Sequence, residues 1–236
     1  MQSLSQLVLA TLTLSLSLLL SGSGLAQEGR PSAEGGAAVE DAGPPTKSGK
    51  LTEVQQKGRT TTLILQMDDG QTHEVKVTPL ISLAINGTGS KDLLEAGRLV
   101  SGTGIMSNNT IFLTEVTVHL LPKGRKAPTG GVQKIEAEAG ESVNQYMVGG
   151  ELTSFGPADG FPEYMALGLK LRGNVPNVWT EKEYTVKVSS ADPEHAPVGS
   201  PVEVQYKLLR GGREMPAAII VTREEPFTLD DVSEDE

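Results

Sequence analysis

The sequence predicts an all-β protein that contains two tandem small antiparallel β-barrels. Apolar and polar residues alternate with a period of two over most of residues 49–223, which is typical of strands with one buried face. Turn signals rich in Gly, Asn and Asp recur at short intervals, as they do in barrels of short strands. The GKLT of residues 49–52 returns as GELT at 150–153, which suggests that one domain is present twice.

The first barrel is expected over residues 49–121, with about six strands and one short helix. The DDG of 68–70 and the SNN of 107–109 predict tight turns, because Asp, Asn and Gly accept the backbone angles that hairpins need. Residues 90–97 predict the helix, which Ser90 can cap and Gly97 can end. The strand-like stretches are 50–55, 60–67, 73–77, 80–85, 98–106 and 110–120.

The second barrel is expected over residues 146–224, in the same order of elements. Gly173 then corresponds to Gly70 and Asp192 to Asp92, and matching positions lie 100 to 105 residues apart throughout. Pro193 and Pro197 stand where the first copy has its helix. Two unrelated β-domains with similar strand and turn composition are the alternative.

Four further segments flank these two. Residues 1–26 resemble a secretory signal, because residues 7–20 are uncharged and mostly apolar and small residues precede a cleavage position between Ala26 and Gln27. The mature protein is therefore expected in the periplasm or outside the cell and not spanning a membrane, although an uncleaved anchor is left open. A disordered leader over 27–48, a linker over 122–145, in which a helical turn or two could form, and a disordered acidic tail over 225–236 complete the expected organisation.

Charge and cysteine content exclude several classes of protein. The net charge is −10, but residues 49–223 hold 19 acidic and 18 basic side chains, so the excess lies in the leader and the tail. Because nucleic-acid binding needs a basic surface, no nucleic-acid partner is expected. Cysteine is absent, so each domain must be stable without disulfides and no thiol can serve as a nucleophile.

One resemblance follows from the order of elements in residues 49–120. The run GKLT, a hairpin, DLLEAGRLV and TEVTV resembles exported bacterial domains of unknown function with a small OB-like barrel. The likeness extends loosely to residues 150–223. It implies a fold but no activity, because such barrels carry many unrelated functions.

Catalytic and metal-binding patterns are not found in the sequence. His73, His119 and His195 lack the spacing that places two imidazoles on one metal ion, so surface histidines, no metal site and no cofactor are expected. No serine lies in a nucleophile motif. The adjacent Asp68 and Asp69 are interpreted as a turn.

Aromatic residues give the only indication of a ligand. Of the nine Phe, Tyr and Trp residues, only Phe112 lies in the first segment. Exposed aromatic rings on a barrel can stack on sugars or peptides, and the candidates are Phe161, Trp179 and Tyr184. The sequence therefore predicts a non-catalytic binding or structural module whose partner is an envelope or extracellular protein or a glycan. The alternative is a hydrolase-like enzyme with a site in the cleft between the barrels.

Overall fold

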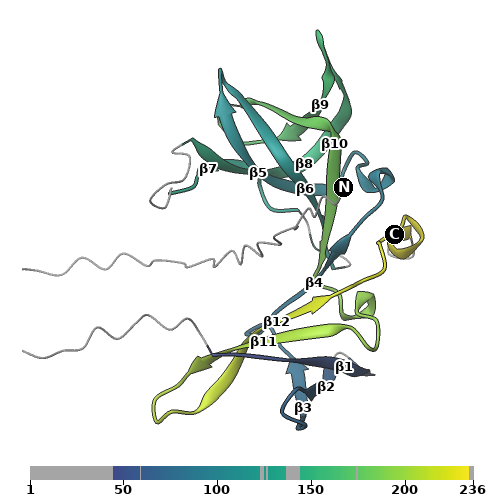
Figure 1. Ribbon diagram of the computed structural model, residues 1–236, viewed down its shortest axis with the longest axis vertical. Coiled ribbons are helices and arrows are strands. Elements are labelled where there is room, and N and C mark those ends of the chain that lie inside the picture. The colour runs from purple at the N-terminus through teal and green to yellow at the C-terminus, as the bar shows by residue number, and fades with distance from the viewer. Residues whose placement is uncertain are drawn as a thin grey trace, which may run out of the picture. The chain divides into compact units, whose positions relative to one another are not determined.

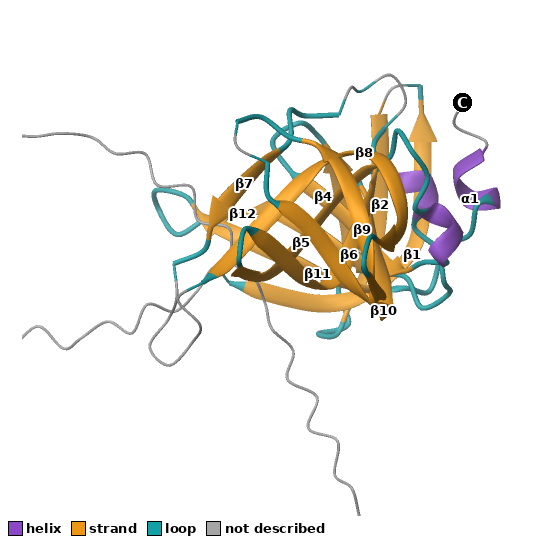
Figure 2. Ribbon diagram, turned by 90° about the horizontal axis from the view of Figure 1, so that it is seen from above, coloured by secondary structure: helices purple, strands orange, loops and turns teal. Residues whose placement is uncertain are grey.

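A computed structural model describes residues 45–58, 60–122, 125, 127–136, 144–173 and 175–233. The described chain is all-β, as predicted: twelve strands are joined by loops and two 3₁₀ turns, and the short helix α1 (Asp230–Ser233) follows the last strand (Figure 2). None of the helical segments in these ranges has the length or apolar character needed to cross a membrane. The expected cleavage position at Ala26 and Gln27, and nearly all of the expected leader, lie outside the described residues.

Five strands close into a barrel. Going round it, the order is β5, β8, β9, β10, β6 and back to β5 (Figure 1). Neighbouring strands are antiparallel except for β6 and β10, which are parallel. The barrel strands are β5 (Leu99–Ser107), β6 (Thr110–Leu120), β8 (Gln145–Ala158), β9 (Phe161–Lys170) and β10 (Asn177–Ser190).

Six further strands form a second curved path beside the barrel. Their order is β3, β2, β1, β11, β12 and β4, with β4 and β12 parallel. β4 also pairs with the end of β10 over Ile85–Thr88, which joins this path to the barrel. The strands are β1 (Thr46–Lys57), β2 (Thr60–Met67), β3 (Thr72–Val77), β4 (Ser82–Thr88), β11 (Pro201–Leu208) and β12 (Glu214–Thr222).

The pairing differs from the sequence prediction, in which residues 49–121 and 146–224 each supply all the strands of one barrel. The closed barrel takes β5 and β6 from the first segment and β8, β9 and β10 from the second. The hairpin of β11 and β12 pairs instead with β1 and β4 of the first segment. Alternation marks a strand and its buried face, but an unpaired strand edge offers the same hydrogen-bonding groups to any partner.

Local turn predictions agree with the structure, whereas the helix and the linker need correction. Gly70 and the pair Asn108 and Asn109 have positive φ in the predicted turns. The helix expected over 90–97 is only the 3₁₀ turn η1 (Lys91–Leu93), where Ser90 makes no capping hydrogen bond through its side chain. The expected linker contributes the strand β7 (Gly131–Lys134), which pairs with β8.

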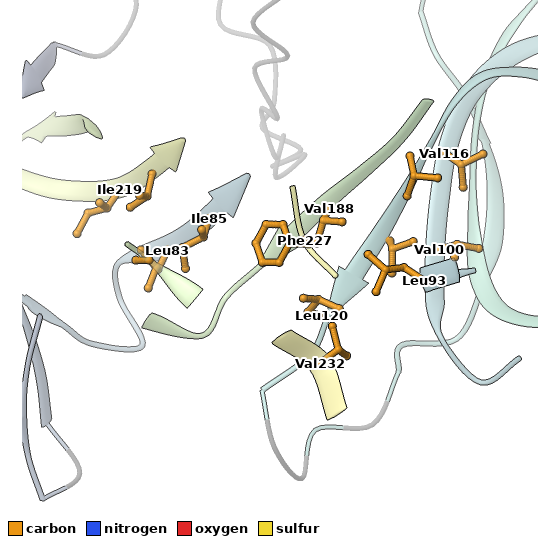
Figure 3. Close-up of a cluster of buried hydrophobic side chains, with 14 of the residues drawn as sticks. Leu83, Ile85, Leu93, Val100, Val116, Leu120, Val188, Ile219, Phe227 and Val232 are labelled. Carbon is orange, nitrogen blue, oxygen red and sulfur yellow. The ribbon is translucent and has the colours of Figure 1, made fainter. Parts of the chain in front are cut away.

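The tail is a second correction, because within residues 225–233 two apolar side chains are anchored in the core, whereas a disordered tail was expected. Phe227 is fully buried and Val232 is 3% exposed. Figure 3 shows Phe227 beside Val188, between the strand that carries Ile85 and the side chain of Leu93. The many carboxylates of the tail concealed this apolar spacing in the sequence.

A polar clamp and a small residue hold the tail in place. The Arg223 guanidinium lies 2.8 Å from Asp231 Oδ1 and 4.4 Å from the Phe227 ring centroid. Partial burial alone would raise the pKa of Asp231, but hydrogen bonds from Thr228 and Arg223 outweigh it, so the pKa is lowered. Gly87 on β4 makes room for the ring, since a Cβ atom there would lie 3.1 Å from Phe227 Cε2.

Candidate binding face

Four aromatic rings gather on the outside of the closed barrel. This aromatic face consists of Phe112, Phe161, Tyr164 and Trp179, from β6, β9 and β10. Trp179 is central: its ring centroid lies 5.0 Å from that of Phe161 and 5.8 Å from those of Tyr164 and Phe112. Phe112 and Tyr164 also meet edge to face at 5.3 Å. These separations are typical of favourable aromatic pairs.

Strand alternation directs the rings of Trp179 and Phe112 outward. Val178 and Thr180, on either side of Trp179, are buried, at 3% and 1% exposure, so Trp179 must point to the opposite face of β10. On β6, Ile111 and Leu113 on either side of Phe112 are buried in the same way, so Phe112 also points to the outer face. Trp179 and Phe112 are opposite one another in the β6–β10 register, which brings the two rings together.

The aromatic face is open to solvent at its margins. Phe161 is 47% exposed, and Ile105, which lies opposite Phe112 on β5, is also 47% exposed. Trp179, Tyr164 and Phe112 are half-buried against one another. The result is an apolar surface that extends across strands far apart in the sequence.

A shallow hollow of about 310 Å³ lies beside Trp179. It has no charged side chain in its lining, and its polar groups include the hydroxyls of Thr153 and Ser154 and the amide of Asn177. Gly168 lies beneath the two hydroxyls, where a Cβ atom would lie 2.8 Å from Thr153 Oγ1. The other lining residues are Ala166, Leu167, Gly168, Leu169, Leu171, Val175, Pro176 and Val178.

Asn177 and Glu181 border the face. The Asn177 N–H donates to the Asn109 carbonyl at 3.0 Å, which holds the turn after β5 next to the start of β10. Glu181 lies opposite Tyr164 in the β9–β10 register, and both Glu181 and Glu163 are exposed. These carboxylates disfavour an anionic ligand by Coulomb repulsion.

The structure brings together only two of the three predicted binding residues. Phe161 and Trp179 belong to the aromatic face, but Tyr184 packs against Phe155 at 5.6 Å, and Lys91 Nζ lies 4.6 Å from its ring centroid. Burial, followed by the charge of Asp92, raises the pKa of Tyr184. Tyr184 follows Trp179 by five positions, an odd number that already indicates the opposite face of a strand.

Phe112 and Tyr164 were not predicted as binding residues. Tyr164 shares a face of β9 with Ala166, which lies directly opposite Trp179, but alternation alone would have placed it on the face opposite Phe161. Phe112 could not have been predicted from the sequence, because it joins the aromatic face only through the pairing of β6 with β10, in which it lies opposite Trp179, 67 residues further along the chain.

The sequence predicted surface histidines, but the three histidines are half-buried. Each contacts a hydroxyl: His73 Nδ1 lies 3.2 Å from Tyr206 Oη, His119 Nε2 2.7 Å from Ser101 Oγ, and His195 Nδ1 2.7 Å from Ser190 Oγ. Burial lowers the pKa of His119. Ser190 is only 1% exposed, so its pairing with His195 fastens a loop and offers no accessible nucleophile. Within the described ranges, no group of three or more His, Cys, Asp or Glu side chains could hold a metal ion.

Comparison of the chain with family models, with curated proteins and with solved structures finds no match.

Proposed function

We propose that this protein is an exported, non-catalytic binding module of the cell envelope or extracellular space, and that its aromatic face binds an uncharged glycan. The observation that carries the proposal is the partly exposed aromatic face around Trp179. Aromatic rings that remain accessible on a barrel provide flat apolar surfaces for the C–H faces of sugar rings.

The surroundings of the aromatic face favour a sugar over other ligands. The hollow beside Trp179 is lined by hydroxyl and amide groups without any charged side chain, which suits the many neutral hydroxyls of a glycan. The exposed carboxylates of Glu163 and Glu181 disfavour nucleic acid and anionic polymers. A few oriented polar groups beside an apolar surface are the usual composition of a small-molecule subsite.

The strand registers support a duplication in which the two copies have exchanged their C-terminal hairpins. Ile85 pairs with Val221, and Val188 pairs with Val118. Ile85 and Val188 are 103 residues apart, as are Val118 and Val221, so one parallel pair maps onto the other.

The first strands repeat this correspondence. Gly49 of GKLT pairs with Val202, and Gly150 of GELT pairs with Val100. Both β1 and β8 then have a register irregularity at the same place, after Leu51 and after Leu152 respectively. Shared positions of such irregularities are expected of copies of one fold.

The closed barrel is best described as OB-like under this proposal. Its strands can be renumbered in the order β8, β9, β10, β5, β6, so that the first three and the last two come from different copies. Three rings of the aromatic face then lie on the second and third strands, and Phe112 lies on the fifth, just after the loop between the last two strands. This is the region where OB-type barrels bind oligosaccharides and oligonucleotides. The tandem pair, the OB-like character and the glycan together form one proposal.

The test is a binding measurement with uncharged oligosaccharides of different linkage on residues 27–236, which contain every described strand. Trp179→Ala removes the central ring, and we expect it to weaken binding about 5- to 150-fold, because loss of one stacked ring costs about 1–3 kcal/mol. Isothermal titration calorimetry gives the affinity.

Tyr184→Ala is the matched control, since it removes an aromatic ring away from the face and should leave the affinity unchanged. An equal loss of affinity in both variants, or no binding of any uncharged oligosaccharide to the parent protein, would contradict the glycan proposal. Cleavage of the probe during the titration would instead support the enzyme alternative.

A further inference from the structure

The last two residues of β11 and the loop that joins it to β12 carry a surface chemistry that differs from the rest of the described chain. Residues Lys207–Arg213, here called the basic tip, are all exposed. Leu208 is 62% and Leu209 41% exposed. Two neighbouring exposed leucines are unusual, because a free surface gains nothing from them in water.

The basic tip is also strongly cationic. It contains Lys207, Arg210 and Arg213 and no acidic residue, although the whole chain has a net charge of −10. The next residue, Glu214, is paired with Lys47 at 2.7 Å, so its charge is largely neutralised. The tip therefore combines three cations with two apolar side chains.

The backbone of the basic tip has a defined shape. Leu209 N–H donates to the Arg213 carbonyl at 2.8 Å, and Gly212 N–H donates to the Leu209 carbonyl at 3.1 Å. Gly211 and Gly212 provide the positive φ angles that this turn needs. At its base, Tyr206 is 4% exposed, which fixes the hairpin to the core. The loop extends beyond neighbouring strands in Figure 1.

We propose that the basic tip binds the surface of an anionic lipid bilayer. Lys and Arg side chains are attracted to phosphate head groups, while leucines gain free energy by entering the acyl boundary. Lys207 and its arginine neighbours have long apolar stems, which allow the leucines to enter while the charges stay at the head groups.

A bilayer fits this loop better than a flat protein surface does. Leu208 and Leu209 are consecutive and both exposed, and consecutive residues of an extended chain point to opposite faces. One flat partner would cover only one of the two leucines. The boundary region of a bilayer surrounds an inserted tip on both sides and covers both.

The test is flotation of residues 27–236 with vesicles of phosphatidylglycerol mixed with phosphatidylcholine, compared with vesicles of phosphatidylcholine alone. Removing residues 1–26 excludes the apolar run of 7–20 from the assay. We expect binding to the anionic vesicles only, and weaker binding as salt is raised. Free inorganic phosphate, added as a competitor at constant total ionic strength, should not displace the protein, since it offers no apolar layer for the leucines.

Two variants separate charge from insertion. Arg210→Gln with Arg213→Gln should reduce vesicle affinity about 25-fold, because each cation near an anionic surface contributes roughly fivefold. Leu208→Ser with Leu209→Ser should also reduce it, without changing the slope of its salt dependence.

Leu80→Ser is the matched control, since Leu80 is 77% exposed but lies in the loop between β3 and β4. The proposal is overturned if the leucine variant binds as the parent protein does, if neutral vesicles bind equally, or if phosphate displaces the protein.

Discussion

The hairpins β5–β6 and β11–β12 share one framework but present different surfaces. Ile105 pairs with Phe112 in the first hairpin, and Lys207 pairs with Met215 at the position that the proposed duplication makes equivalent. The first hairpin ends in the two-residue turn Asn108–Asn109, next to the aromatic face. The second ends in the longer basic tip.

This difference shows which positions the fold restricts. At matching positions near the base of both hairpins the inward side chains are aliphatic and almost fully buried: Val100 and Val118 in one, Val202 and Val221 in the other. The outward positions and the turns do not contribute to the core, so they can change without loss of the strand framework. Binding chemistry is accordingly expected on the outward faces and at the hairpin ends.

The largest expected effect concerns which hairpin completes which set of strands. Lys50 lies opposite Pro201 on β11, whereas a barrel closed within residues 49–121 would bring Lys50 opposite Leu99. Because the chain has no cysteine, Lys50→Cys with Pro201→Cys should form an intrachain disulfide nearly completely. Lys50→Cys with Leu99→Cys should keep its free thiols.

Mobility on a non-reducing gel, together with thiol titration, distinguishes the two variants. A disulfide in the Lys50 and Leu99 variant would mean that each segment closes on itself. The proposed exchange of hairpins between the two segments would then be wrong.

The next effect tests whether the two strand sets unfold together. Phe227 contacts the region of Gly87 on β4, and its ring lies 5.8 Å from that of His195 in the turn after β10. Phe227→Ala should lower the free energy of unfolding by about 3–5 kcal/mol, because it leaves a cavity in a fully buried site. Urea unfolding should show one transition that shifts as a whole.

Phe161→Ala provides the contrast, since Phe161 is 47% exposed. We expect it to change the free energy of unfolding by less than about 1 kcal/mol. Two separate transitions in the Phe227 variant, with only one of them shifted, would show that the strand sets are independent.

The smallest effect is a pH dependence that belongs to the β5–β6 hairpin. Burial lowers the pKa of His119 below its ordinary 6.5, so the unfolded chain takes up this proton at a higher pH than the folded chain. The contribution to stability is full above about pH 6.5 and is lost as pH falls toward the lowered pKa, by at most about 1.4 kcal/mol per pH unit.

His119→Gln should reduce the difference between urea midpoints measured at about pH 7.5 and about pH 5.5. An unchanged difference would mean that other groups carry the acid sensitivity of this hairpin.

Local features of the fold and part of the candidate site could be predicted. The alternation around Leu63, Val118 and Val204 marks strands because the side-chain period of a strand is two. Aromatic character made Phe161, Trp179 and Tyr184 candidates, and the period of two would have separated Tyr184 from Trp179. The tail was wrongly predicted to be disordered because its many carboxylates drew attention away from Phe227. The burial of Phe227 depends on the space beside Gly87, which the sequence does not reveal.

The sequence by itself determined the all-β class and the positions of most strands and turns, because both depend on residues close together in the chain. Only the tertiary structure decided which hairpin joins which strands, where the tail packs, and that Phe112 meets Trp179. Those outcomes depend on contacts between distant segments, and every strand edge carries the same hydrogen-bonding groups. Shape and burial, rather than local pattern, select the partner.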